Sequence, residues 1–489
     1  MHSLKELIGL MLDQNYSDAS FKYSPDEIRA ISDRCKDLIS RDYDVEFVSN
    51  VDGSLCSHYP PSLFIPKSEN ALEAELCALI SRAKFARGRN RFVAPAFSYR
   101  DKFVCRSSTL SVSLELYGRQ VANVAGFSFD SPFTLPYANM TMDECDDRST
   151  LNRVRDEDCE LMKQFRIRYI CDLMLEYRKI KYWLPVTSSE KADNHDRYHD
   201  FVILALPYPG SEFFRVWKDS NYMMRGLVFD WQQPMIEVQL QPDFLPKTLL
   251  SSHINWALYK SWDVTTLTVN YLKLLLGLLF EGAGGLLIHC VSGWDRTPLF
   301  VSLMRCLLWA DDLAHQSLQP EEMLYYTLAY DWFLFGHQLR TRMESGEEIL
   351  YFAFRFLAEV AADASLSIRA VYDMVLPSDK VTPDCNRPSL DFVEVKWSSN
   401  LLQIRQSRLE QLTALFIKTW TSLVDRLNTP SSISHSSSPV QPSRNMRSVN
   451  YSETYKSNVI SQVSDYFSSI HPLLVVIIII IMEHWSGSR

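Results

Sequence analysis

The feature that most constrains this fold is an apolar strand joined to a buried helix by a short turn. Residues 284–290, "GGLLIHC", form a continuous hydrophobic run that predicts a buried strand. Residues 297–313, "TPLFVSLMRCLLWADDL", predict a helix with Thr297 as N-cap and Pro298 at its first helical position. The turn between them contains Gly293, which can adopt backbone angles that other residues avoid. A strand, a loop and a helix N-terminus in this order form a cradle for an anion, because backbone N–H groups converge there.

The neighbouring sequence indicates an α/β domain. Residues 168–175, "RYICDLML", and 200–210, "DFVILALPYPG", read as two further buried strands, and residues 265–281 read as a long buried helix. Strands that alternate with helices predict a layered domain in which helices flank a sheet.

The length of 489 residues allows two or three domains. Helices are expected at 24–42, where Ser24 is a cap and Pro25 the first helical residue, and at 68–87. We expect five parts in chain order: an N-terminal helical and mixed segment (1–85), the α/β domain (86–365), a linker (366–398), an amphipathic helix (399–428) and a serine-rich, disordered tail with a short apolar end (429–489).

Two apolar features lie after the α/β domain. The 399–428 helix carries one apolar stripe, formed by Leu409, Leu412, Phe416, Trp420, Leu423 and Leu427. We expect this stripe to dock on the domain, and the alternatives are a coiled-coil contact that forms an oligomer or a membrane role. Residues 473–482, "LLVVIIIIIM", are too few to span a bilayer as a helix. They read as a buried strand or aggregation-prone tail, with a membrane-dipping anchor as the alternative.

Composition excludes several classes of protein. The formal charge of -9 provides no global basic footprint, so a nucleic-acid partner is not expected. The ten cysteines include no C-x-x-C pair, which argues against a zinc ribbon or a thioredoxin-type site. Charges interrupt the apolar N-terminus, which makes it a poor signal peptide. We therefore expect a cytoplasmic protein with reduced thiols.

The spacing C-x5-R occurs twice, and only the second copy has the context of an anion site. Cys35 and Arg41 lie in "CKDLISR", inside a predicted helix that has no glycine and follows no strand, so Cys35 is interpreted as structural. Cys290 and Arg296 flank the glycine-containing turn described above. The alternative for Cys290 is a buried cysteine at an ordinary turn.

The residue types of the second copy predict phosphate chemistry. A helix N-terminus and the cation Arg296 lower the pKa of a thiol, and the Thr297 hydroxyl can donate to the sulfur. Arg296 offers a planar fork for two phosphate oxygens. As a hypothesis, Cys290 attacks phosphorus, Arg296 and the loop amides hold the equatorial oxygens, and water hydrolyses the phosphocysteine. No metal or cofactor is expected.

The leaving group also needs a proton donor. Asp295 lies in the loop and is the preferred candidate, and its alternative role is to pair with a nearby cation and only shape the loop. The rival acid is Asp243, in the proline–aspartate turn "QPDFLP" (241–246) upstream. Two histidines are further candidates. His289 can tune the thiolate or merely end the strand, and His337 can support the loop or be purely structural.

The motif "HCVSGWDRTPLF" (289–300) resembles the signature C-x-x-G-W-D-R-T of the myotubularin phosphoinositide 3-phosphatases. The resemblance covers roughly residues 80–360, includes "YICDLM", "VTSSEK", "PYPGSEFF", "NYLKLLL" and "AYDWFLFGH", and is nearest to the divergent Jumpy, or egg-derived tyrosine phosphatase, branch. It implies a cysteine-dependent, tyrosine-phosphatase-like α/β fold whose central mixed sheet is flanked by helices, with residues 86–365 as the phosphatase domain.

The resemblance also implies an activity. Its expected substrates are phosphatidylinositol 3-phosphate and phosphatidylinositol 3,5-bisphosphate, cleaved at the 3-position, with the in-loop aspartate as proposed acid. The expected partner is a phosphoinositide headgroup in a membrane surface, reached by peripheral contact with endosomal or autophagic membranes. A protein tyrosine or dual-specificity phosphatase and a non-catalytic phosphoinositide-binding scaffold are the alternatives. The retained Cys290 and Arg296 argue against the scaffold, and the Trp294–Asp295 pair argues against the protein phosphatase.

The chain departs from the family pattern in two places. The phosphate-binding loop is expected to consist of Val291, Ser292, Gly293, Trp294 and Thr297 beside the catalytic residues. Val291 and Ser292 stand where most members have serine and aspartate, which removes a negative charge from this loop. Residues 1–100 show no convincing PH-GRAM lipid-binding module, so membrane targeting needs another source. Two basic clusters are candidate rims for an anionic surface, with solvated faces as the alternative: Lys163, Arg166, Arg168, Arg178, Lys179 and Lys181, and Arg82, Lys84, Arg87, Arg89 and Arg91.

Overall fold

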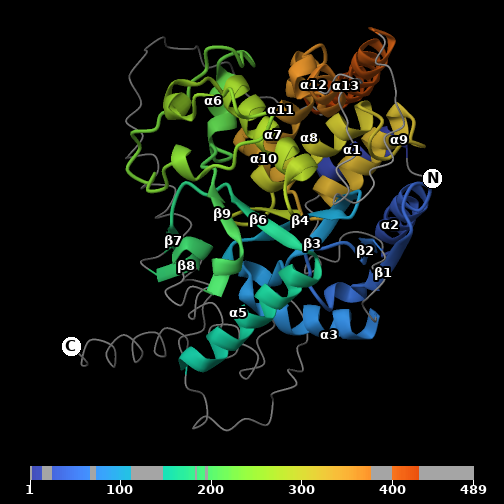
Figure 1. Cartoon of the computed structure of the whole chain (residues 1–489). Coiled ribbons are helices and arrows are strands. Elements are labelled where there is room, and N and C mark those ends of the chain that lie inside the picture. The colour runs from blue at the N-terminus through green and yellow to red at the C-terminus, as the bar shows by residue number, and fades with distance from the viewer. Residues whose placement is uncertain are drawn as a thin grey trace, which may run out of the picture. The chain divides into compact units, whose positions relative to one another are not determined.

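The strand predicted before the loop is the central strand of a five-stranded sheet in the computed structural model (Figure 1). The structure describes residues 3–13, 25–66, 73–111, 147–181, 184–192, 197–375 and 399–428. The sheet order is β3-β4-β10-β6-β9. Its strands are β3 (Ala94–Tyr99), β4 (Lys102–Ser108), β10 (Gly285–Cys290), β6 (Ile167–Asp172) and β9 (Val202–Ala205). β3 runs antiparallel to β4 and the other neighbours pair in parallel, which confirms the expected α/β class with a central mixed sheet.

Helices cover both faces of this sheet (Figure 1). On one side α7 (Val264–Glu281) and α8 (Arg296–Ala310) pack on β10, and on the other side α5 (Asp147–Gln164) packs on β6. Within the described residues, α7 is the one helix long and apolar enough to cross a membrane. Two thirds of its apolar window is buried inside the protein (67%), so α7 forms part of the core.

The starts of these helices follow local capping chemistry, and one start differs from the prediction. The Asp263 side chain accepts a hydrogen bond from the backbone N–H of Thr266 and so caps α7. Helix α8 begins at Arg296 with Asp295 as N-cap, so the expectation that Thr297 is the N-cap was wrong. Thr297 lies in the first turn instead, and its hydroxyl is used elsewhere.

The N-terminal elements share the core of the α/β domain. They are α1 (Leu4–Asp13), α2 (Pro25–Ile39), β1 (Val45–Ser49), β2 (Ser62–Pro66) and α3 (Glu73–Ala83). α3 ends at Ala83, four residues before the end expected at 87, because two 3-10 turns at Lys84–Ala86 and Gly88–Asn90 follow it. Residues 1–429 form one compact unit, and the domain boundaries expected at 85 and 365 remain predictions.

Smaller elements complete the edges of the domain. A second sheet has the order β5-β8-β7, formed by Leu110–Ser111, Leu184–Ser188 and Arg178–Lys181. Helix α6 spans Phe213–Asp219, and short 3-10 turns occur at Val51–Gly53, Glu190–Ala192, Arg197–Asp200, Pro242–Phe244, Trp256–Ser261 and Ala364–Leu366.

The C-terminal helices enclose α8. They are α9 (Pro320–Tyr326), a π-helical turn (Thr327–Phe333), α10 (Leu339–Ser345), α11 (Ile349–Glu359), α12 (Ile368–Val375) and α13 (Ser399–Asn428). α12 occupies part of the segment expected as a linker at 366–398, and residues 376–398 lie outside the described part.

The apolar stripe of α13 packs against other helices of the same chain. Leu409, Leu412, Phe416 and Trp420 are buried, and Phe416 stacks on Phe354 of α11 with ring centroids 4.1 Å apart. These four members of the stripe therefore dock on the domain, as expected, and Leu423 is half-buried. The side chain of Leu427 lies outside the described part. The tail at 429–489, including the apolar stretch 473–482, lies outside the described residues.

Candidate active site

Cys290 is the last residue of β10 and lies at the floor of a loop that leads into α8. The loop turns at Gly293, whose φ is +71°. A Cβ placed on Gly293 would lie 2.7 Å from the backbone oxygen of Ser107 in β4. Both the backbone angle and the lack of space therefore require glycine at this position. The structure brings the predicted loop residues, from Val291 to Thr297, around one sulfur atom.

Three donors point at the Cys290 sulfur. The Gly293 backbone N–H and the Thr297 hydroxyl each donate to Sγ over 3.3 Å, and the backbone N–H of Thr297 also donates to it. Burial alone would raise the pKa of the thiol, since the side chain is 3% exposed. The positive charge of Arg296 and the Thr297 hydrogen bonds outweigh burial, so the pKa of Cys290 lies below its ordinary value. These surroundings favour the thiolate form of Cys290, the form that a nucleophilic cysteine needs.

Arg296 is held in place by two backbone carbonyls. Its Nη1 donates to Leu173 O over 2.7 Å and to Tyr208 O over 3.1 Å. Leu173 follows β6, which pairs with β10, and Tyr208 lies three residues after β9, which pairs with β6, so the guanidinium is attached near the ends of two adjacent strands. Because Arg296 is 8% exposed and fixed at one nitrogen, its planar fork is pre-organised for an oxyanion.

Two buried arginines support the loop from below. Arg91 and Arg106 both donate to the carbonyl oxygen of Gly293, over 3.3 and 3.0 Å. Arg106 also donates to Asp331 O over 2.6 Å, and Arg91 to Phe335 O over 2.6 Å. The expectation that Arg91 belongs to a basic rim was therefore wrong, because burial and carbonyl contacts make it a support for the loop.

Asp295 is clamped as an ion. Arg342 donates from Nη2 to Oδ2 over 2.7 Å and from Nε to Oδ1 over 3.1 Å. His337 Nδ1 lies 3.1 Å from the same Oδ1 and 3.0 Å from the carbonyl oxygen of Trp294. Both of these oxygens are acceptors, so Nδ1 is the donor. Burial would raise the pKa of Asp295, but Arg342 and His337 hold it well below its usual range, so the carboxyl carries no proton in this arrangement.

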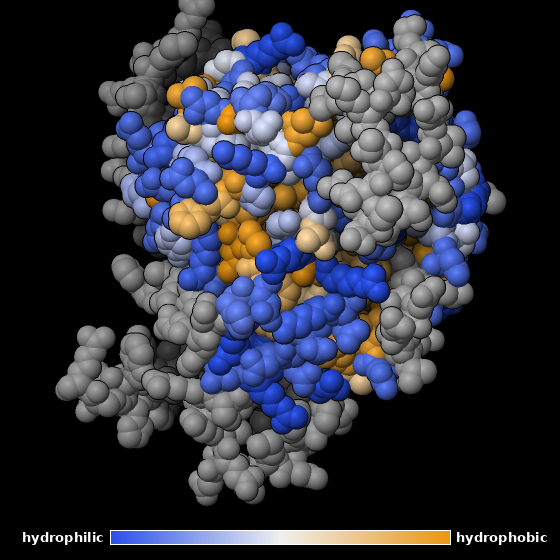
Figure 2. Space-filling view, viewed as in Figure 1, coloured by the Kyte–Doolittle hydropathy of each residue, from blue (hydrophilic) through white to orange (hydrophobic). Residues whose placement is uncertain are grey.

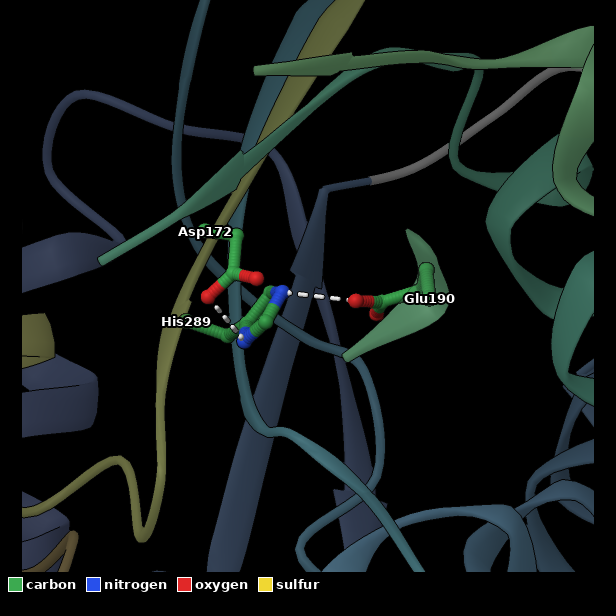
Figure 3. A group of neighbouring side chains, drawn as sticks. All are labelled: Asp172, Glu190 and His289. Carbon is green, nitrogen blue, oxygen red and sulfur yellow. Dashed lines mark ion pairs between the residues drawn. The ribbon is translucent and has the colours of Figure 1, made fainter. Parts of the chain in front are cut away.

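The two remaining candidates do not touch the sulfur. Asp243 is exposed in the 3-10 turn at Pro242–Phe244, and within the described residues no hydrogen bond or ion pair joins it to the loop. His289 precedes Cys290 on β10, so its side chain points to the opposite face of the sheet. There it lies between Asp172 and Glu190 (Figure 3).

This histidine and the two carboxylates are close enough to be considered as a metal site, but the contacts fit an ion-pair bridge better. Asp172 faces one ring nitrogen and Glu190 the other, so the two carboxylates lie on opposite sides of the imidazole (Figure 3). Arg87 already contacts Glu190, with Nη1 2.5 Å from Oε1. A metal cation beside this guanidinium would face like-charge repulsion in a buried setting.

The rim of the site carries one exposed arginine that reaches the loop. Arg89 Nη1 donates to Ser292 Oγ over 2.9 Å, and its guanidinium lies 4.7 Å from the Trp294 ring centroid. Arg89 and Asn90 both have positive φ, +56° and +55°, and such backbone in non-glycine residues often accompanies functional sites.

Several other members of the two basic clusters are buried or paired, whereas Arg166 is exposed and stays a predicted member of the rim. Lys84 and Arg87 are buried, and Arg82 pairs with Glu157 over 2.9 Å. The face over α5 is mainly hydrophilic (Figure 2), and two of its basic residues contact Asp200. Lys163 lies 2.8 Å from Asp200, and Arg168 donates to the Asp200 backbone oxygen. The side chains of Arg178, Lys179 and Lys181 lie outside what the structure describes.

The structure adds site residues that the sequence reasoning missed. They are Arg106 and Arg342, which support the loop and clamp Asp295, and Asp172 and Glu190, which contact His289. For Arg106 a signal existed, because a charged residue inside the apolar strand "KFVCRSS" needs a buried partner. Glu190 had no local signal, since its partners are distant in sequence.

Comparison with known proteins agrees with this geometry. Residues 39–440 match the model of the myotubularin-like phosphatase domain. The chain is 42% identical over 369 residues to the human protein named phosphatidylinositol-3,5-bisphosphate 3-phosphatase MTMR14, which covers 72% of this chain and 56% of that protein. It is 43% identical over 358 residues to the mouse protein of the same name, covering 70% and 55%. The chain thus spans a little over half the length of these relatives. On the extent of the domain match and the loop that it contains, the chain belongs to the myotubularin-like phosphatase family.

Proposed function

We propose that this protein is a phosphoinositide 3-phosphatase that acts on phosphatidylinositol 3-phosphate and phosphatidylinositol 3,5-bisphosphate. The observation that carries the proposal is the Cys290 sulfur, which receives three hydrogen bonds beside the fixed guanidinium of Arg296. The names of the two relatives support the substrate class and the position of cleavage.

The first chemical step transfers the phosphoryl group to sulfur. The Cys290 thiolate attacks phosphorus, the S–P bond forms, and the bond from phosphorus to the inositol 3-oxygen breaks. The loop amides and the Arg296 guanidinium hold the equatorial oxygens, where negative charge is concentrated in the transition state. The inositol oxygen leaves and takes up a proton.

Asp295 remains the proposed donor of that proton, under a stated condition. In the structure its carboxylate is ionised and bound by Arg342. A phosphate dianion entering the loop raises the pKa of a neighbouring carboxyl, since like charges disfavour the ionised form. Asp295 therefore acts as the acid only if the bound substrate raises its pKa enough for the carboxyl to take up a proton despite Arg342. In the second step water attacks the phosphocysteine, inorganic phosphate leaves, and the thiolate is restored.

The proposed substrate places the enzyme at a membrane surface. We infer a cytoplasmic protein that contacts endosomal and autophagic membranes peripherally, because both substrates are lipids. Six of the nine exposed large apolar side chains in the described part fall between residues 216 and 258. They are Val216, Met223, Val228, Met235, Phe244 and Leu258. This segment adjoins the site, since the backbone N–H groups of Glu237 and Val238 donate to Leu175 O.

A substrate panel tests the proposal. Phosphate release is measured from short-chain phosphatidylinositol 3-phosphate, 4-phosphate, 5-phosphate and 3,5-bisphosphate, and from a phosphotyrosine peptide. Release confined to the two 3-phosphorylated lipids supports the proposal. Preferred release from the peptide would instead indicate a protein phosphatase, and binding without any release would indicate a scaffold.

A further inference from the structure

A group of charged side chains is fully buried on the face of the sheet opposite to Cys290. All are at most 2% exposed: Arg87, Asp158, Asp172, Glu190 and His289. Burying so many charges is costly unless each is paired, and a pair is destabilising when one partner is removed. The group also comes from segments far apart in the chain, so a structural reason must hold these residues together.

The imidazole of His289 bridges two carboxylates (Figure 3). Its Nε2 lies 3.0 Å from Glu190 Oε2, and its Nδ1 lies 3.8 Å from Asp172 Oδ1. Burial would lower the pKa of His289, but Glu190 and then Asp172 raise it above its ordinary value, against a smaller opposing contribution from Arg87. The ring therefore lies buried between two carboxylates that favour its protonated form.

Arg87 anchors the far end of this bridge. Its Nη1 lies 2.5 Å from Glu190 Oε1 and its Nη2 lies 2.7 Å from Asp158 Oδ2 on α5. Glu190 is thus held from both sides, by a guanidinium and by an imidazolium. The His289 ring and the Glu190 carboxylate therefore cannot move without breaking at least one buried ion pair.

The near end of the bridge leads to the catalytic arginine. His289 and Asp172 are direct neighbours in the parallel pairing of β10 and β6. The Leu173 N–H donates to His289 O over 3.0 Å, and the Leu173 carbonyl accepts from Arg296 Nη1 over 2.7 Å. Asp172 also accepts from the Met174 N–H over 2.9 Å, and from the Ser189 hydroxyl. The residue that orients Arg296 therefore lies between two anchored neighbours.

We propose that Glu190 is a positioning residue, which through the His289–Asp172 bridge fixes the ends of β10 and β6 so that Leu173 holds Arg296 beside Cys290. This role rests on the proposed function only in that Arg296 grips a phosphate. It concerns the placement of the anion-binding group and is independent of which phosphate ester is cleaved.

The experiment measures anion binding and leaves lipid turnover aside. Cys290 in the full chain is alkylated with iodoacetamide at several pH values, with and without inorganic phosphate, which protects the thiolate when it occupies the loop. In Glu190→Gln we expect protection to weaken about tenfold or more, because a misplacement of about 1 Å can cost about a hundredfold in a pre-organised site. The loss should grow as the pH rises, since His289 then has only Asp172 to keep it protonated.

Two further variants separate positioning from general stability. Glu190→Asp keeps the charge and should recover part of the protection together with the pH dependence of the unaltered protein. Asp311→Asn removes one partner of another buried ion pair, Asp311–Arg405 at 2.9 Å, which joins the end of α8 to α13. This control should lower the melting temperature and leave phosphate protection unchanged at every pH.

The outcomes are distinct. Unchanged protection in Glu190→Gln, or an equal loss in Asp311→Asn, would overturn the positioning role. If Glu190→Gln does not fold, Ser189→Ala removes only the hydroxyl bound to Asp172 and should give a smaller loss in the same direction, and no loss there counts against the proposal. If the unaltered protein releases no phosphate from lipids while Glu190→Gln still loses protection, the proposed function fails and the positioning role stands.

Discussion

The chain contains two cysteine–arginine pairs of identical spacing in opposite environments. Cys35 lies in the middle of α2 and is 0% exposed, and burial raises the pKa of its thiol far above the ordinary value. Its partner Arg41 points outward and pairs with Glu322 on α9 over 2.8 Å. Cys290 is almost equally buried, yet the pKa of its thiol is lowered.

The difference shows that burial alone does not decide the state of a thiol. In a helix interior the backbone N–H groups are bonded to the preceding turn, so none is available to the Cys35 sulfur. At the end of β10 the chain leaves regular structure, and the N–H groups of Gly293 and Thr297 turn toward Cys290. The pKa of a buried thiol therefore depends on the cation and the hydrogen-bond donors around the sulfur, which at Cys290 are Arg296 and Thr297.

The largest expected effect separates the two cysteines directly. Cys290→Ser should lower kcat by at least about a thousandfold, since loss of a nucleophile removes the covalent step. Cys35→Ser should leave kcat unchanged and lower the free energy of unfolding by about 1–3 kcal/mol, because it buries a hydroxyl. Phosphate release and thermal unfolding measured on both variants check this pair. Equal losses of activity would erase the distinction.

The arginines provide the next comparison. Arg296→Lys should lower kcat about a hundredfold or more, because a lysine cannot supply the two-pronged contact to phosphate oxygens. Arg41→Lys alters an ion pair whose side chains are 45% and 27% exposed, and such pairs contribute about 0–1 kcal/mol. Initial rates on a short-chain 3-phosphorylated lipid test both. A rate for Arg296→Lys near that of the unaltered protein would show that the guanidinium is not essential.

A pH profile tests what lowers the pKa of Cys290. Thr297→Ala removes the hydroxyl that donates to the sulfur, so the pKa of the thiol should rise. The thiolate is the reactive form, so the acidic limb of kcat/KM moves to higher pH. Each unit of the rise lowers the rate about tenfold below the pKa, while the rate at alkaline pH changes little. Thr413→Ala on α13, a buried threonine remote from the loop, is the matched control. A shift in both variants would point to a global effect.

The smallest expected effect concerns Arg89, at the rim of the loop between Cys290 and Arg296. Arg89→Ala removes the hydrogen bond to Ser292 and an exposed cation beside the loop, so KM should rise a few-fold while kcat stays within about twofold. Arg82→Ala, in the same basic segment but paired with Glu157, should change neither. Kinetics on the mono- and bisphosphorylated lipids provide the measurement, and identical behaviour of the two variants would remove Arg89 from the site.

Much of the fold near the loop could be predicted, and the reasons are local. The strands around residues 168–175 and 284–290 are mostly apolar runs, and α7 and α8 have long buried faces. β3 and β4 were not predicted as strands, because prolines and polar residues interrupt their pattern. The start of α8 was predicted wrongly because threonine and proline often begin helices. In the structure the Thr297 hydroxyl donates to the Cys290 sulfur and does not cap the helix.

The sequence by itself determined the layout of the loop. Cysteine, glycine, arginine and threonine at fixed spacing after an apolar strand can be read locally, because the loop's geometry depends on a few adjacent backbone angles. Only the tertiary structure decided what surrounds that loop. It showed that Arg87 and Arg91 are buried, that Arg342 binds Asp295, and that Glu190 and Asp172 bracket His289. These contacts join residues that lie tens to more than a hundred positions apart, so the sequence around either residue does not predict them.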